Sequence, residues 1–247
     1  MSVAGMKILV TGASSGIGEH LAAFLASAGA DVVAAARRLD NLEALAERAD
    51  GRITPLVMDV SDPDSVTRGV KKASEIMGGI TGLFNNAGIA WGGHALKMTH
   101  EDWMRVIDSN VNGVFRAATA CAPIISECGG GAILNTASVL SFRPGEKVAA
   151  YSTSKAAVAH MTKNLALEWA PMNVRVNAIA PGYFPTEMTN PFLATPKGQA
   201  LADNVPMRRF GILHELEGPV ELLLGSKGSF ITGVTLPVDG GHLCQSV

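Results

Sequence analysis

Tyr151 and Lys155 are the two residues of this chain whose types and spacing point most directly to chemistry. They are four positions apart on a helix predicted around 152–170, so they share one helical face with Cβ atoms roughly 5–6 Å apart. A free tyrosine has a pKa of about 10 and is a poor base at neutral pH. A neighbouring ammonium favours the phenolate and lowers that pKa toward working pH. The pair therefore predicts proton transfer by the phenol.

A glycine-rich octet at 11–18, Thr-Gly-Ala-Ser-Ser-Gly-Ile-Gly, is the second such segment. Glycines of this kind permit a tight turn, let the backbone approach a pyrophosphate and let a helix pack closely on a strand. The N-terminus of the following helix offers N–H groups and a partial positive charge to a phosphate. The octet follows an apolar run at 7–10 and opens an amphipathic helix at 17–28, which distinguishes it from an ordinary glycine turn.

The elements that must position these residues are strands and helices that alternate along the chain. Strands are predicted at 7–10, 31–36, 53–58, 83–84, 132–137 and 174–176, separated by helical patterns. The strand runs are continuously apolar, as expected for parallel strands covered on both faces. We therefore expect one doubly wound α/β (Rossmann) domain over 1–247, with a parallel sheet and helices on both faces. The stretch 183–210 contains several prolines and is the one region expected to be irregular.

Ser138 follows the predicted strand 132–137, at the end of the strands where open α/β sheets bind ligands. Its hydroxyl can donate to a substrate oxygen and stabilise developing alkoxide charge.

Composition excludes several classes of function. The 247 residues include 20 Lys+Arg and 22 Asp+Glu, for a net charge of -2, and 47% are hydrophobic. This balance argues against a nucleic-acid or anionic-membrane binder and against disorder. No signal peptide and no membrane-length apolar run is visible. Cys121, Cys128 and Cys244 show neither disulfide nor zinc spacing, and the histidines show no metal-ligand spacing, so we expect reduced thiols, no metal site and a cytoplasmic location.

These segments, in this order, resemble those of the short-chain dehydrogenase/reductase family in its compact form of about 250 residues. The resemblance covers almost the whole chain. It rests on the octet T-G-x-x-x-G-x-G, Asp59, Asn-Asn-Ala-Gly at 85–88, Asn110, Ser138, Tyr-Ser-Thr-Ser-Lys at 151–155, Pro-Gly at 181–182 and Val-Asp-Gly-Gly at 238–241. It implies an oxidoreductase that transfers hydride between a nicotinamide cofactor and a carbonyl or secondary alcohol.

The resemblance also implies roles for individual residues. Tyr151 would be the general acid in reduction and the base in oxidation, Lys155 would hold the nicotinamide ribose, and Asn110 would serve a water chain leading to that lysine. The implied catalytic set is Asn110, Ser138, Tyr151 and Lys155. The implied cofactor-binding set is Gly12, Ser14, Ser15, Gly16, Ile17, Gly18, Arg37, Asp59, Val60, Asn86, Ala87, Gly88, Tyr151, Lys155, Pro181, Gly182, Phe184 and Thr186.

The residues after the second strand favour NADP(H) over NAD(H). An acidic residue there binds the ribose 2′-hydroxyl of NAD, whereas an arginine accommodates the 2′-phosphate of NADP. The resemblance places Ala36 at the acidic position and Arg37 directly after it. Arg37 and Arg38 are alternatively a solvated start to the next helix. Ser15 departs from the basic residue that some NADP-using relatives carry in the octet.

The stretch 183–210 would be a substrate lid. Arg143 is either a solvated loop residue or a ligand to an anionic substrate. A 3-oxoacyl-carrier-protein reductase and a non-catalytic dinucleotide-binding sensor or scaffold are the alternative functions. The segments 128–130 and 171–172 lack the basic residues that such reductases offer to an acidic carrier. The family pairs the helices around 114–125 and 152–170 between subunits, which implies a homotetramer.

Overall fold

The computed structural model describes residues 2–49 and 51–244. The strands are β1 (Lys7–Thr11), β2 (Asp31–Ala36), β3 (Ile53–Val57), β4 (Gly82–Asn85), β5 (Gly131–Thr136), β6 (Val174–Pro181) and β7 (Thr235–Val238). The helices are α1 (Gly16–Ser27), α2 (Leu39–Glu47), α3 (Pro63–Met77), α4 (His100–Ile107), α5 (Gly113–Glu127), α6 (Ala149–Trp169), α7 (Asn190–Leu193), α8 (Pro196–Asn204) and α9 (Glu217–Leu224).

The strands form one parallel sheet in the order β3-β2-β1-β4-β5-β6-β7. The chain winds outward from β1 in one direction and from β4 in the other, so the strand order reverses between these two strands. This confirms the predicted doubly wound sheet. In such sheets ligands bind at the carboxyl ends of the strands, next to this reversal.

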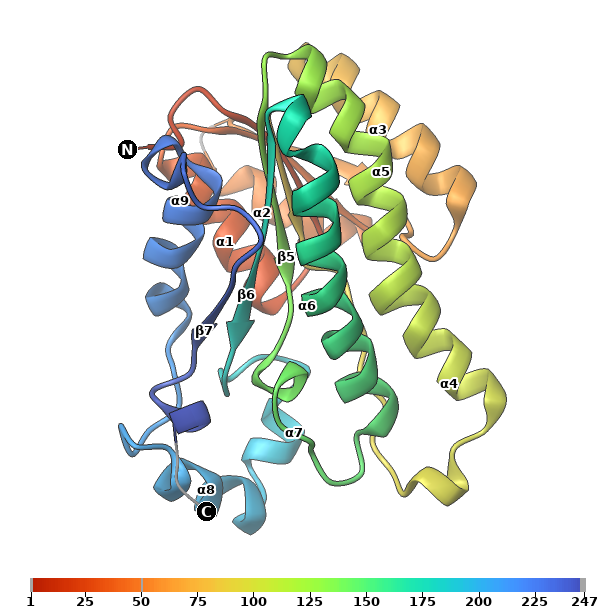
Figure 1. Ribbon diagram of the computed structural model, residues 1–247, viewed down its shortest axis with the longest axis vertical. Helices are drawn as coiled ribbons and strands as arrows, with labels where there is room; N and C mark the ends of the chain where they lie inside the picture. Colours follow the sequence, from red (N-terminus) through yellow and green to blue (C-terminus); the bar gives the residue numbers. More distant parts are fainter. Residues whose placement is uncertain (1, 50, 245–247) are drawn as a thin grey trace.

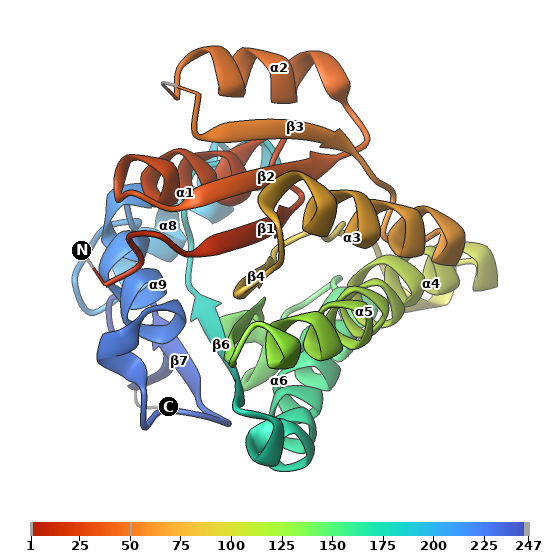
Figure 2. The ribbon, with the colours of Figure 1, turned by 90° about the horizontal axis from the view of Figure 1, so that it is seen from above.

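Two apolar layers cover the sheet. Side chains of α1, α2 and α9 pack on one face, and those of α3, α5 and α6 pack on the other, with α1 and α9 opposite α3, α5 and α6 in Figure 2. Strand residues such as Ile8 and Leu9 are fully buried on opposite faces. This explains the continuously apolar strand sequences, because neither face meets water.

The segment after β6 differs from the sequence-based expectation of an irregular stretch. It contains α7 and α8, which lie beyond the carboxyl ends of the strands in Figure 1. Pro191 and Pro196 occupy the first turns of these helices. Proline is favoured there because the missing N–H would have no intrahelical partner. The prolines that suggested a loop therefore mark helix starts.

Among the described helices, none combines the length and the apolar composition that crossing a bilayer requires.

Candidate active site

The glycine-rich turn between β1 and α1 leaves no room for a side chain at Gly12 or Gly18. Gly12 has a φ of +68°, and a Cβ on it would lie 2.7 Å from the Ala87 Cα. A Cβ on Gly18 would collide with the Gly12 carbonyl oxygen. The turn is therefore a cradle of bare backbone, which fits the close approach of a dinucleotide pyrophosphate.

The N-terminus of α1 opens from this cradle. Ser15 is the N-cap residue, but its side chain does not cap the amides of the first turn. Its Oγ instead accepts a hydrogen bond from the Arg38 guanidinium at 2.7 Å. The first N–H groups of the helix thus keep their capacity to bind an anion.

A cavity of about 490 Å³ extends from this turn along the carboxyl ends of the strands. Most of the residues that the sequence predicted for the cofactor line it. They are Gly12, Ser14, Ser15, Gly16, Ile17, Arg37, Asp59, Val60, Asn86, Ala87, Gly88, Tyr151, Lys155, Pro181, Gly182, Phe184 and Thr186. Ser138 lines the same cavity, whereas Gly18 and Asn110 do not. Gly18 contributes close packing of α1 on the turn, as described above.

Tyr151 and Lys155 lie in the first two turns of α6 on the cavity wall. The Lys155 Nζ is 5.6 Å from the centroid of the Tyr151 ring and donates a hydrogen bond to the Thr136 carbonyl oxygen at 2.7 Å. Lys155 is 3% exposed. The ammonium is thus held at the end of β5, beside the phenol and facing the cavity.

Ser138 is held by the turn that follows β5. Its Oγ accepts from the Leu140 amide at 3.1 Å, and its own amide donates to the Ser141 Oγ at 3.2 Å. The Ser141 hydroxyl in turn donates to the Lys155 carbonyl oxygen at 2.8 Å. This short network ties the serine to the helix that carries the phenol.

Burial sets the protonation of the two groups on α6. It raises the pKa of Tyr151 to about 12, although a hydrogen bond with Ser138 lowers it. Burial also lowers the pKa of Lys155 to about 8. Burial opposes the lowering of the Tyr151 pKa expected from Lys155, because desolvation disfavours the charged form of each group. The phenol is protonated at neutral pH, as an ordinary tyrosine is, and can donate its proton.

Asn110 lies behind the cavity wall, fully buried in a π-helical turn between α4 and α5. Its Oδ1 accepts from the Ile89 amide at 2.8 Å, and its Nδ2 donates to the Ile89 carbonyl at 2.9 Å and the Ser154 Oγ at 3.0 Å. Asn110 thus joins the segment after β4 to α6. The structure places it as a support for the wall that carries Gly88 and Lys155.

Arg38, which the sequence analysis did not select, contacts the glycine-rich turn. Its guanidinium donates to the Ser14 Oγ at 3.3 Å and to the Ser15 Oγ at 2.7 Å. Arg37 lines the cavity with an exposed side chain. The adjacent arginines look alike in sequence, and only their directions from the end of β2 distinguish them.

Tyr183, Arg143 and His242 form a further group of side chains, none of which lines this cavity. The Tyr183 and His242 rings meet edge-on with centroids 5.5 Å apart. Arg143 is half-buried and donates to the Leu243 carbonyl at 3.2 Å, so it is not simply a solvated loop residue. The His242 Nδ1 is buried and has no hydrogen-bond partner among the described residues.

Comparison with known proteins gives a consistent picture. The family model described as short chain dehydrogenase matches residues 6–197. The 3-oxoacyl-[acyl-carrier-protein] reductase of Thermotoga maritima is 36% identical over 244 residues, which cover 98% of this chain and 99% of that protein.

Two solved structures are similar over nearly their whole length. A gluconate 5-dehydrogenase from Burkholderia cenocepacia, in complex with NADP and tartrate, has a TM-score of 0.94 and 32% identity, covering 98% of this chain and 97% of that one. A 3-ketoacyl-(acyl-carrier-protein) reductase from Brucella melitensis, complexed with NADH, has a TM-score of 0.92 and 33% identity, covering 98% and 99%.

Proposed function

The chain belongs to the short-chain dehydrogenase/reductase family, and on that premise we propose that it is an NADP(H)-dependent oxidoreductase that interconverts a ketone and a secondary alcohol. The observation that carries the proposal is the convergence of Ser138, Tyr151 and Lys155 on one wall of a cavity that begins at the glycine-rich turn. When bound, the nicotinamide cofactor supplies or accepts the hydride.

The chain's own residues supply the proton and the orientation. In reduction the Tyr151 hydroxyl, which is protonated at neutral pH, donates its proton to the carbonyl oxygen. The Ser138 hydroxyl donates to the same oxygen and stabilises its developing charge. Lys155, held by the Thr136 carbonyl, would bind the hydroxyls of the cofactor ribose.

NADP(H) is the cofactor that the site favours. Ala36 places no carboxylate at the end of β2, and Arg37 and Arg38 both line the cavity. A guanidinium binds a phosphate by charge-assisted, often bidentate hydrogen bonds. The NADP in the Burkholderia cenocepacia relative supports this choice, whereas the NADH in the Brucella melitensis relative keeps NAD(H) as the alternative.

For the substrate we favour a small polar ketone. Tyr183 is close enough to Tyr151 to raise the pKa of that phenol and stacks edge-on against His242, so polar groups lie near the reacting hydroxyl, and 183–210 would close over them as the lid. The second candidate is a carrier-protein thioester, because the Thermotoga maritima relative is such a reductase. The lack of basic residues at 128–130 and 171–172 counts against it.

The test is spectrophotometric oxidation of NADPH and NADH against hydroxy-ketones, sugar-acid ketones and β-ketoacyl thioesters. We expect turnover with a free ketone and a preference for NADPH. Nucleotide binding without turnover of any substrate would favour the sensor or scaffold alternative.

We also propose that the protein is a cytoplasmic homotetramer. Phe115 on α5 is 48% exposed and Leu167 on α6 is 79% exposed, and these are the two helices through which the family resemblance implies subunit pairing. Light scattering at micromolar concentration should give four times the mass of the chain, and a monomer would contradict the proposal.

A further inference from the structure

An ion pair crosses the mouth of the cavity between segments far apart in the sequence. Arg38 follows β2, and Glu187 lies in the turn between β6 and α7. The Glu187 Oε2 is 3.3 Å from both Nη1 and Nη2 of Arg38. Both residues line the cavity. The Glu187 carboxylate of the proposed lid therefore forms an ion pair with the Arg38 guanidinium, which lies on the glycine-rich turn.

Arg38 does not depend on Glu187 for its position. Its Nε donates to the Ser14 Oγ, and its Nη2 donates to the Ser14 carbonyl at 3.4 Å and to the Ser15 Oγ. The same Ser14 carbonyl accepts from the Asn41 Nδ2 at 2.9 Å. Three contacts thus hold the guanidinium on the turn without the carboxylate, and the Asn41 contact holds the turn itself.

The ion pair is one that a phosphate can displace. The Arg38 and Glu187 side chains are 50% and 66% exposed, and exposed ion pairs contribute little to stability because solvent screens them. A phosphate monoester carries about -1.5 to -2 charges at neutral pH and three strong acceptor oxygens. It therefore binds the guanidinium more strongly than a single carboxylate does.

We propose that Glu187 is a selectivity-determining residue that competes with the 2′-phosphate of NADP for Arg38. NAD lacks this phosphate, so the competition weakens NADP binding and leaves NAD binding almost unchanged. Displacement of the carboxylate would also release the first turn of the lid from the glycine-rich turn. This inference rests on the proposed function, since it takes NADP as a ligand of the cavity.

The experiment measures dissociation constants for NADPH and NADH by nucleotide fluorescence with Glu187→Gln, Arg38→Gln and the double variant. Glu187→Gln should tighten NADPH binding about three- to tenfold and change NADH binding less than twofold. Arg38→Gln should weaken NADPH binding about tenfold or more. In the Arg38→Gln background the Glu187 substitution should have little further effect, because the two act through one guanidinium.

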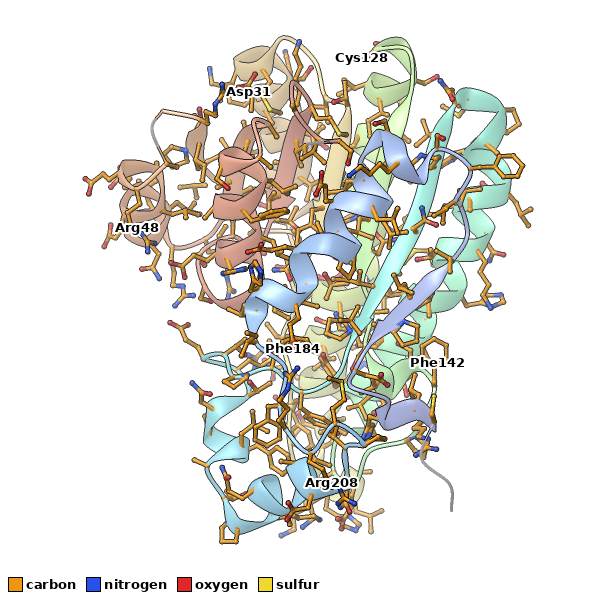
Figure 3. All side chains as sticks on the ribbon, turned by 90° about the vertical axis from the view of Figure 1, so that its left-hand side faces the viewer. Asp31, Arg48, Cys128, Phe142, Phe184 and Arg208 are labelled. Atoms are coloured by element: carbon orange, nitrogen blue, oxygen red, sulfur yellow. The ribbon has the colours of Figure 1, made fainter. Side chains whose placement is uncertain are left out.

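Asp31→Asn is the matched control. Asp31 pairs with Arg52 at 3.3 Å, with exposures of 56% and 52%, but it is the first residue of β2 and lies well above the cavity-lining Phe184 in Figure 3. It should change neither constant. Weaker NADPH binding by Glu187→Gln, or equal changes for both nucleotides, would overturn the inference alone. A wild-type protein that binds neither nucleotide would overturn the proposed function as well.

Discussion

The glycine-rich turn and the segment 183–210 face each other across the cavity and are built in opposite ways. The turn is held by the sheet: Ala13 donates to the Ala35 carbonyl at 3.2 Å, and the Thr11 hydroxyl accepts from the amides of Asn86 and Ala87 at 3.1 Å. The facing segment exposes apolar side chains, including Met188 at 49% and Met207 at 58%.

This difference indicates that the two regions serve different ligands. Groups fixed by strand ends can hold a constant part of the reaction, the cofactor. A segment with fewer buried contacts opens at a lower free-energy cost and can adapt to the substrate. The comparison predicts that changes at the turn act on nucleotide binding, and that changes in 188–210, past the cavity-lining residues Phe184, Thr186 and Glu187, act on substrate use.

The largest expected effect is on the catalytic step, which depends on Tyr151 and on neither of these two regions. Tyr151→Phe removes the proton donor while the buried ring remains. We expect turnover to fall by about 10²–10⁴-fold and NADPH affinity to change by no more than about twofold. Steady-state kinetics and fluorescence titration would measure the two. Turnover close to that of the wild type would contradict the assignment of the proton to Tyr151.

Two phenylalanines test the contrast within 183–210 itself. Phe184 is 4% exposed and belongs to the core on the α1 face, whereas Phe192 is 42% exposed. Phe184→Ala should lower the free energy of unfolding by about 3–5 kcal/mol. Phe192→Ala should lower it by less than about 1 kcal/mol and should mainly raise the KM of the substrate. Denaturant unfolding would measure the stability of the two variants, and steady-state kinetics would measure their KM. Equal destabilisation by the two substitutions would contradict the predicted difference between Phe184 and Phe192.

At the turn, Gly12→Ala should damage nucleotide binding. The added Cβ meets the Ala87 backbone at 2.7 Å in a left-handed conformation, which costs about 1–3 kcal/mol. We expect NADPH affinity to fall about tenfold or more. Gly218→Ala is the control, since a Cβ there has no atom within 4 Å and alanine favours the helix. Unchanged NADPH binding by Gly12→Ala would show that the turn tolerates a side chain.

The smallest effect is a pH dependence of stability. Because the pKa of Lys155 is lowered from 10.5 to about 8, the folded chain binds fewer protons than the unfolded chain above pH 8. The contribution of Lys155 to the free energy of unfolding therefore rises with pH from about 8 toward 10. In the wild type this increase is on the order of 1–3 kcal/mol. The Lys155→Met variant should not show it. Urea unfolding at pH 7.5 and 9.5 would measure it, and parallel curves for both proteins would exclude it.

Local sequence patterns carried the prediction of most elements. Apolar runs and glycine stops located β1, α1 and β2, and Asp62 before Pro63 marked the start of α3, where the Asp62 carboxylate accepts from the Asp64 amide at 2.9 Å. The helices α7 and α8 were missed because the prolines at their starts read as loop signals. The strand β7 was not predicted either, since Thr235–Val238 is short and contains Pro237.

What the sequence determined by itself was therefore the order of the strands β1 to β6, the glycine turn at Gly12 and the placement of Tyr151 and Lys155 one turn apart. These features follow from local geometry, which nearby residues set. Only the tertiary structure decided that Arg38 lies on the turn, that Asn110 lies behind the wall and that burial raises the pKa of Tyr151. Side-chain direction and desolvation depend on neighbours that come from distant parts of the chain, and no local pattern encodes them.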